Sequence, residues 1–229
     1  MIRKHLLLAA AILIASASAA SADELVMSGL GDGQGWNDGA YYTGYVNLNF
    51  DGQNYAGLCV DALHDTFGNS WNAVYVPLTN TATLAAVMKS YFSMSNPAVY
   101  MPDLYADVVG WLQLGAPGLT EAANNNIQHA VWSQLDPSQF SDTIGLYQEA
   151  QADAPNGYGT IPSPAGGTIT VNLSNFGLLV DANYAHGGTL EQAFLVDGVN
   201  TPEPANRGTA GAALLGLFFL MACRRHKTA

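Results

Sequence analysis

The sequence predicts an α+β fold, with a β-sandwich or barrel-like core and a helical insertion at about residues 79–153. Two observations predict it. Segments rich in β-branched and aromatic residues stand on either side of the insertion, within residues 41–60 and 168–196. Between them, apolar residues recur every three or four positions, the spacing of amphipathic helices. This order, with no internal repeat, favours a single domain at residues 23–200.

The first strands are expected as a hairpin. Residues 41–50 alternate in polarity, and Asp51-Gly52 is a turn signal. The second strand, residues 53–60, carries Cys59 near its end. After a proline-rich loop, strands are expected to resume at residues 168–173, 178–180 and 192–196.

Four helices are expected in the insertion. The first two cover residues 81–92 and 104–114, and the glycines and proline at 115–118 end the second. Thr120 caps a third helix that runs to about residue 134. The fourth covers residues 141–152, with Ser141 or Asp142 as its cap.

The first 22 residues have the pattern of a cleaved signal peptide. Arg3 and Lys4 precede a short apolar run, and Ala20-Ser21-Ala22 is an A-x-A cleavage site. The apolar run is too short for a spanning helix, so we expect export by the Sec route rather than retention as an anchor.

Residues 201–229 read as a sorting tail. Pro202-Glu203-Pro204 is followed by an apolar run at 211–222, a short transmembrane helix, and then by Arg224 and Arg225. This order resembles the PEP-CTERM tail of Gram-negative bacteria. The resemblance implies transient anchoring in the inner membrane, cleavage by an exosortase and delivery to the cell surface or extracellular matrix. The alternative is a plain C-terminal membrane anchor.

The segment between signal and tail is strongly acidic. Lys89 is its one Lys or Arg against seventeen Asp and Glu, a formal net charge of −16 with neutral histidines. Such a charge excludes nucleic acid and disfavours anionic membranes as partners. The acidity suits solubility outside the cell. The near absence of lysine favours a domain that holds an electrophile reactive toward amines.

Cys59 is the one cysteine between signal and tail, because Cys223 lies at the end of the tail's apolar run. Exported proteins usually carry cysteines in disulfide pairs, so a lone thiol suggests another covalent partner. Gln128 stands among apolar residues in Ile127-Gln128-His129-Ala130-Val131-Trp132. A thiolate held against its carboxamide would displace ammonia and leave a thioester.

An apolar-flanked cysteine at a strand end, followed by Gln-x-Ala-Val-Trp, resembles the Cys–Gln thioester domains of bacterial surface adhesins. The resemblance spans about residues 41–135 and implies a Cys59–Gln128 thioester, with Ala130 and Trp132 holding the glutamine in place. It implies covalent capture of an amine on a surface or biofilm-matrix protein, with no enzymatic turnover and no cofactor. Leu58 departs from the aromatic residue that often precedes the cysteine.

The residues also leave other interpretations open. Asp61, His64 and His129 are the nearby groups that could activate the thiol, a role they would also have in a cysteine-nucleophile hydrolase. Cys59 could instead be an ordinary buried cysteine of a structural or glycan-binding domain, or part of a cross-link that serves stability only. Residues 32–38 are rich in Asp, Asn and Gly but lack EF-hand spacing, so no metal site is expected.

Overall fold

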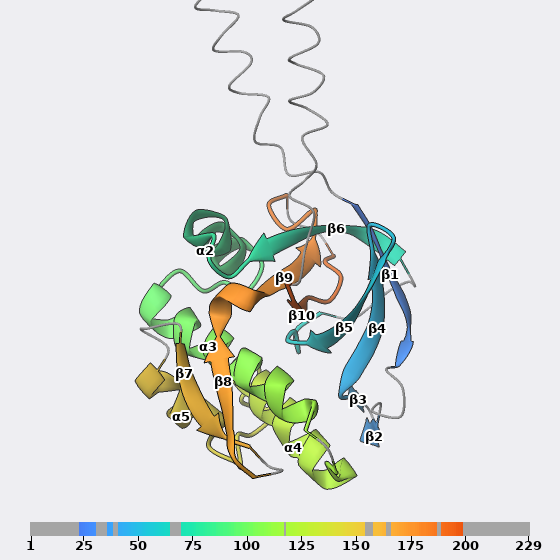
Figure 1. Cartoon of the computed structure of the whole chain (residues 1–229). Coiled ribbons are helices and arrows are strands. Elements are labelled where there is room, and N and C mark those ends of the chain that lie inside the picture. Colours follow the sequence, from blue (N-terminus) through green and yellow to red (C-terminus); the bar gives the residue numbers. More distant parts are fainter. Residues whose placement is uncertain are drawn as a thin grey trace, which may run out of the picture. The chain divides into compact units, whose positions relative to one another are not determined.

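The computed structural model describes residues 23–30, 36–38, 41–64, 70–116, 118–153, 158–163, 166–186 and 189–198 (Figure 1). The chain divides into two units, Met1–Ser21 with Asn200–Ala229, and Ala22–Val199. Every described residue belongs to the second unit. The expected signal peptide and sorting tail, with its transmembrane helix, lie outside the described residues.

Six strands close into a barrel in the order β1-β4-β5-β10-β9-β6, with all neighbours antiparallel. Together with the helices this confirms an α+β architecture, and of the two predicted cores the barrel is the one that forms. Closure pairs both edges of the sheet. The strands are β1 (Asp23–Leu30), β4 (Tyr45–Phe50), β5 (Gln53–Cys59), β6 (Ser70–Pro77), β9 (Phe176–Asp181) and β10 (Phe194–Asp197).

The predicted hairpin is formed by β4 and β5. Alternate residues of β4 are buried, and the turn residues Asp51 and Gly52 have φ angles of 50° and 76°. Positive φ at both positions is the requirement of a type I′ hairpin turn. Gly57 lets the strands pack closely, because a Cβ at this position would stand 2.3 Å from Leu48 Cδ1. The hairpin thereby delivers Cys59 to the end of β5.

Several strands differ from the prediction. The expected strand at residues 41–50 is divided by Gly44 into β3 (Tyr41–Thr43) and β4. β3 pairs with β2 (Trp36–Asp38), and β7 (Tyr158–Pro162) pairs with β8 (Thr168–Asn172). β1, β2, β6 and β7 were not predicted. β1 and β6 lack clear alternation, and their pairing with β4 and β9 stabilises them through contacts distant in sequence.

The helices α2 (Thr81–Ser90), α3 (Pro97–Leu114), α4 (Glu121–Trp132) and α5 (Leu146–Asp153) lie between β6 and β7, where the insertion was predicted. α3 begins earlier than expected. Asn96 caps it by accepting from Ala98 N at 3.0 Å, and packing of the helix outweighs the cost of Pro102 inside it.

Caps were predicted from the sequence for two helices, α4 and α5. Thr120 caps α4 as predicted, accepting from Ala123 N at 3.3 Å. α5 begins later than expected, at Leu146. The Asp142 carboxylate accepts from the backbone nitrogens of Leu146 and Tyr147 at 3.0 and 2.9 Å, so Asp142 satisfies the first turn from a position further upstream.

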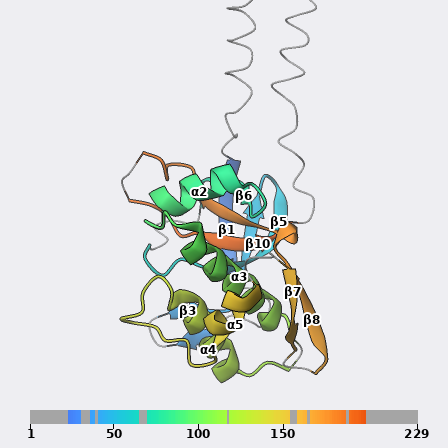
Figure 2. The same ribbon diagram turned by 90° about the vertical axis from the view of Figure 1, so that its left-hand side faces the viewer.

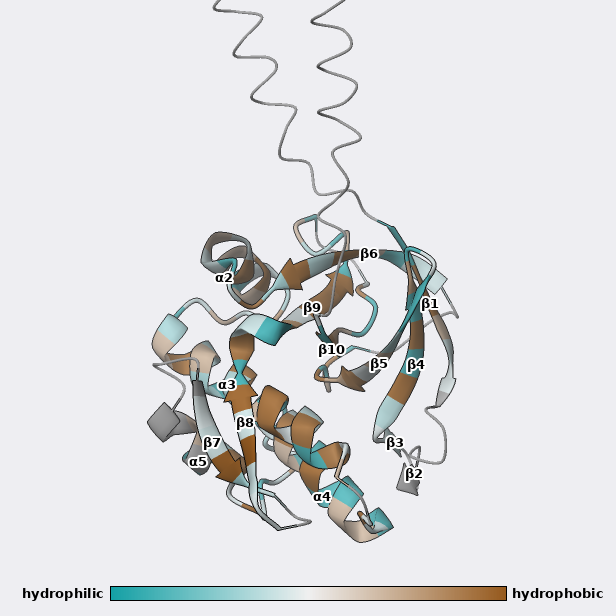
Figure 3. Cartoon of the chain, viewed as in Figure 1, coloured by the Kyte–Doolittle hydropathy of each residue, from teal (hydrophilic) through white to brown (hydrophobic). Residues whose placement is uncertain are grey.

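α3 is the central helix of the described unit (Figure 2). Every residue from 102 to 110 is buried, as expected for a helix packed on all sides. α3 packs against α4, α5, β8 and β10. α4 is hydrophilic in its N-terminal half and more hydrophobic in its C-terminal half, the half that carries Gln128 (Figure 3).

Candidate functional site

Cys59 is the last residue of β5 and pairs with Phe194 of β10. It is the free cysteine of the described residues, and its side chain is buried. The thiol donates to the backbone oxygen of Asp61 at 3.4 Å. Strand pairing on one side and the Asp61 contact on the other therefore hold Cys59 where β5 leaves the barrel.

The structure brings Gln128 to Cys59. The Gln128 side chain is fully buried, and its Nε2 donates to the backbone oxygen of Cys59 at 2.8 Å. Trp132, one turn later on α4, donates its indole Nε1 to the same oxygen at 2.9 Å. Three residues singled out from the sequence therefore meet at one carbonyl group, although 69 positions separate Cys59 from Gln128.

The other end of the carboxamide is held by Gly44. Its backbone N–H donates to Gln128 Oε1 at 3.2 Å. Because a carbonyl oxygen only accepts and an amide nitrogen only donates, the two partners fix the orientation of the Gln128 side chain. An N–H on the amide oxygen is also the type of donor that stabilises an oxyanion when a nucleophile adds to the carbon.

Gly44 was missed by the sequence analysis. Its φ angle is +97°, a conformation that favours glycine, and it interrupts the alternation of residues 41–50. Asn124 Nδ2 donates to Thr43 Oγ1 at 2.9 Å, which fixes the β3–β4 junction to α4. An isolated glycine inside a strand pattern often marks a close backbone approach, and this was the available signal.

An aromatic cluster covers the C-terminal end of α4. Tyr41, Trp132 and Phe140 lie with ring centroids 5.0 to 5.7 Å apart. His129 packs on Phe140 at 5.3 Å, and Ala130 is buried. The cluster packs against the Trp132 indole, which donates to Cys59.

Asp61 organises the chain that follows β5. Its side chain is fully buried, and Oδ1 accepts from the backbone nitrogens of Leu63 and His64 at 2.9 and 3.2 Å. Oδ2 accepts from Tyr91 Oη at 2.6 Å and Ala193 N at 3.3 Å, and lies 2.8 Å from His64 Nδ1. The hydrogen bond between the His64 side chain and the Asp61 carboxylate raises the pKa of His64. Asp61 and His64 thus form a hydrogen-bonded pair adjoining Cys59.

The thiol itself lies in an environment that keeps it protonated. Burial raises the pKa of Cys59 to about 12, and the negative charges of Asp61 and Asp107 act in the same direction. At neutral pH the nucleophilic thiolate is therefore a very small fraction. Any reaction of Cys59 needs a nearby proton acceptor.

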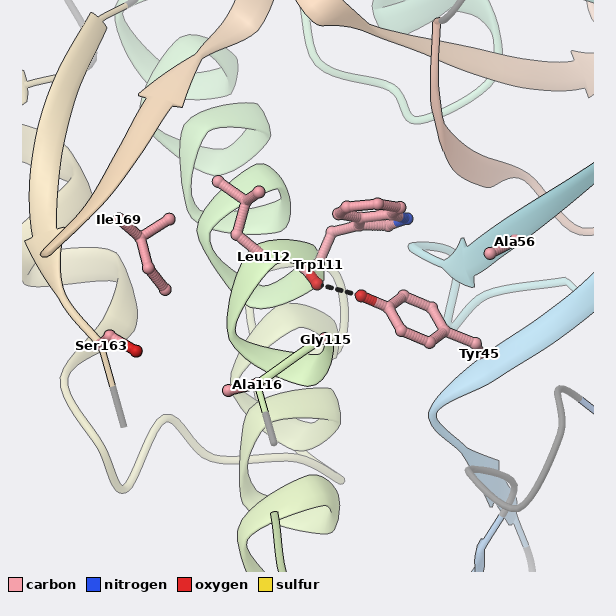
Figure 4. A pocket seen from close by; sticks show the side chains of 8 residues that line it. All are labelled: Tyr45, Ala56, Trp111, Leu112, Gly115, Ala116, Ser163 and Ile169. Atoms are coloured by element: carbon pink, nitrogen blue, oxygen red, sulfur yellow. Dashed lines mark hydrogen bonds between the residues drawn. The ribbon is translucent and has the colours of Figure 1, made fainter. Parts of the chain in front are cut away.

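A separate cavity of about 520 Å³ lies beside the barrel (Figure 4). Tyr45 and Trp111 line it with ring centroids 5.3 Å apart, and Tyr45 Oη donates to the backbone oxygen of Trp111. Ala56 and Ile169 contribute apolar walls. The cavity is close to the Cys59 region in the chain, because Tyr45 directly follows Gly44.

Some predicted features receive no structural account. The sorting-signal residues Pro202, Glu203, Pro204, Arg224 and Arg225 lie outside the described residues. Among the helices that the structure describes, none is long and apolar enough to cross a membrane. Within the same residues, no group of three or more His, Cys, Asp and Glu side chains could hold a metal ion.

Comparisons with known proteins identified no relative of this chain. No protein-family profile, curated protein or solved structure matches this chain. The functional interpretation therefore depends on the geometry around Cys59 and on the sequence motifs.

Proposed function

We propose that Cys59 and Gln128 form an internal thioester with which this exported protein captures an amine-bearing target. One observation carries the proposal: the buried Gln128 carboxamide is held at both ends, by Gly44 and by the backbone of Cys59. Cys59, whose backbone oxygen accepts the hydrogen bond from Gln128 Nε2, also carries the nucleophilic Sγ atom. Bringing the two residues together supplies much of what such a reaction needs.

The chemistry is a transfer of the Gln128 acyl group. Cys59 Sγ bonds to Cδ, the Cδ–Nε2 bond breaks, and the thiol proton leaves with the nitrogen as ammonia. A target amine then attacks Cδ, the S–C bond breaks, and the thiol is regenerated while an amide links the target to Gln128. Each molecule reacts once, so the protein is not an enzyme in the usual sense.

The site also explains why the product would persist in water. Gln128 is fully buried and Cys59 nearly so, and Trp132 keeps the Cys59 carbonyl satisfied after ammonia has left. Exclusion of water protects a reactive acyl group from hydrolysis. The scarcity of lysine in the exported segment fits the same proposal, because Lys89 is the one internal primary amine side chain.

The proposed setting follows from the two ends of the chain. A signal peptide at residues 1–22 and a PEP-CTERM-like tail at 201–229 imply Sec export, transient inner-membrane anchoring and exosortase cleavage. The target is then an amine on a surface or matrix protein, and the role is adhesion or attachment within a biofilm. The strong negative charge of the exported segment favours a basic, lysine-bearing target.

Mass spectrometry of the purified full-length protein tests the proposal. The thioester form is lighter than the sequence mass by one ammonia, and digestion gives a Cys59 peptide joined to a Gln128 peptide. Methylamine should add at Gln128 and expose one alkylatable thiol. The matched variants Cys59→Ser and Gln128→Glu should have their full masses and not react with methylamine. A wild-type protein of full mass with a freely alkylatable Cys59 contradicts the proposal.

The cavity beside Trp111 supports a second candidate function, the binding of a sugar. Aromatic side chains stack on sugar rings, and Tyr45 and Trp111 line this cavity together. Binding of oligosaccharides that Trp111→Ala abolishes and Cys59→Ser preserves would support it. Binding unaffected by Trp111→Ala would contradict it.

A further inference from the structure

Two buried carboxyl groups lie on α3 without an obvious structural role. Asp103 and Asp107 are four residues apart on one helix face, with exposed fractions of 5% and 4%. Among the described residues, the Oδ1 atom of each lacks a hydrogen-bond partner. An orphaned buried carboxylate oxygen costs stability, so a pair of them requires an explanation.

The pair lies on the helix that packs against both halves of the site. α3 contacts α4, which carries Gln128, and β10, which pairs with β5 at Cys59 (Figure 2). α3 and α4 approach closely at Gly110, where a Cβ would stand 2.8 Å from Val131 Cγ2. Asp107 is one turn before this close approach. Gly110 also faces Ile127 Cγ2 at 3.4 Å, so Asp107 is one turn of α3 away from a contact with the neighbour of Gln128.

Burial sets the protonation of the pair. It raises the pKa of Asp103 to about 7. It also raises the pKa of Asp107, and the charge of Asp103 adds to this shift. The effect extends to the thiol, because the charge of Asp107 contributes to the raised pKa of Cys59. Of the two carboxyls, Asp107 is therefore the one that interacts electrostatically with the thiol.

Other ionisable groups around α3 are few. On the elements packed against it they include Glu121 and His129 of α4, Tyr147 of α5 and Asp197 of β10, and β8 has none. Cys59 and Asp61 follow on the neighbouring β5 side. Lys89, the one Lys or Arg in the described ranges, is exposed near the end of α2. Within those ranges no Lys or Arg is therefore buried beside the pair to hold both carboxyls ionised.

We propose that the Asp103–Asp107 pair takes up and returns the proton in the reactions of the Cys59–Gln128 site, with Asp107 as the member nearer the thiol. The inference depends on the thioester function proposed above. During formation, the thiol proton passes to the carboxyl pair as the S–C bond forms. The pair then gives a proton to Nε2, which departs as ammonia.

The same pair serves the capture step. The attacking amine nitrogen must lose a proton when it bonds to Cδ, and the leaving Sγ must gain one. A pair of buried carboxyl groups with raised pKa values can accept the first and supply the second. His64, which is held by Asp61 and partly exposed, is the competing candidate for this role.

The test compares methylamine reaction rates of full-length wild type, Asp107→Asn, Asp103→Asn and His64→Gln from pH 5.5 to 9. Asn has the size of Asp, so the fold should be retained, as circular dichroism will show. We expect Asp107→Asn to slow both thioester formation and methylamine capture by about 10- to 100-fold. Asp107→Glu, which keeps the carboxyl, should recover part of the rate.

Asp103→Asn is the matched control on the same helix face. It removes the charge that helps raise the pKa of Asp107, so the acid limb of the rate profile should move to lower pH with a smaller loss of rate. If Asp107→Asn does not fold, the shift of the Asp103→Asn rate profile still tests the role of the pair. A structural role alone would change stability but not the pH profile.

The two proposals fail in different ways. If wild type lacks the ammonia-deficient mass, both the thioester and the proton-transfer role are wrong. If wild type forms the thioester but Asp107→Asn and Asp103→Asn keep its rate and pH profile, only the role of the pair is wrong. A profile that changes with His64→Gln alone assigns the proton transfer to His64 and also overturns this inference.

Discussion

The end of β5 and the middle of α3 both bury aspartate, and they do so in opposite ways. Asp61 has five hydrogen-bond partners, three of them backbone N–H groups. Asp103 and Asp107 each keep an oxygen with no partner within the described residues. A buried carboxylate with all its hydrogen bonds made fixes local structure. A buried pair with unsatisfied oxygens has raised pKa values and lowers the stability of the fold.

This contrast assigns the two regions different tasks. Asp61 ties the chain after Cys59 to α2 through Tyr91 and to the segment before β10 through Ala193. It therefore positions Cys59 without needing to react. Within the described residues the α3 pair makes no such links, and burial raises the pKa of Asp103 to about 7 and that of Asp107 in the same direction. Four predictions separate these tasks.

The largest expected effect is that of Asp61→Ala. It leaves several buried donors without an acceptor, so we expect a loss of about 3–5 kcal/mol in the free energy of unfolding, measured by urea denaturation. Asp61→Asn, which keeps one acceptor oxygen, should cost clearly less. Equal stability of wild type and Asp61→Ala would show that the two regions do not differ in the way we describe.

The second prediction concerns the pH dependence of stability. The pKa of Asp103 is raised in the folded state, so its contribution is complete below the unfolded value of about 4 and is lost as pH rises through about 7. We expect wild type to lose about 2–4 kcal/mol between pH 4.5 and pH 8, and Asp103→Asn to lose less. Urea denaturation at several pH values measures both, and parallel curves for the two proteins would contradict the prediction.

The third prediction concerns Trp132→Phe, which removes one of the two donors to the Cys59 carbonyl. In a Cys59→Ser background, in which Gln128 keeps its amide and still donates, the loss should be about 1 kcal/mol. Combined with Gln128→Leu, the carbonyl loses both donors, and the cost should exceed the sum of the single changes. A double-mutant cycle measures this coupling, and strict additivity would argue against the shared acceptor.

The smallest expected effect is that of His64→Ala. The hydrogen bond to Asp61 raises the pKa of His64, so it stabilises the fold at acidic pH and this contribution is lost as pH rises through the folded pKa. Because the side chain is partly exposed, we expect less than about 1 kcal/mol at pH 5.5 and almost none at pH 8.5. Thermal unfolding at the two pH values tests the difference, and a larger loss at pH 8.5 would reverse the assignment.

The sequence was sufficient where the signal is local. The Asp51-Gly52 turn, the β4–β5 hairpin and the Thr120 cap of α4 all depend on neighbours in sequence, and each forms as predicted. Cys59 and Gln128 were paired from a sequence motif and a family resemblance. The structure brings the Gln128 amide to the Cys59 backbone, and the thioester itself stays a prediction.

What the sequence did not reveal depends on distant contacts. β1 and β6 become strands through barrel closure, and α3 extends back through Pro102 because it is surrounded on all sides. Gly44 donates to a residue 84 positions away, and no local pattern specifies that partner. No prediction was made for Asp103 and Asp107, since burial of a carboxyl has no signature of its own in sequence.

The position of β10 has a mechanical consequence. This four-residue strand is the last described strand, and it is bonded along both edges, to β5 and to β9. A pull on the chain beyond Asp197 would load both ladders in shear, and one of them ends at Cys59 opposite Phe194. Tension from an anchored C-terminus would therefore reach the strand that carries the thiol before it reached α4. Cys59 and Gln128 therefore lie at the junction where load would pass from the sheet to α4.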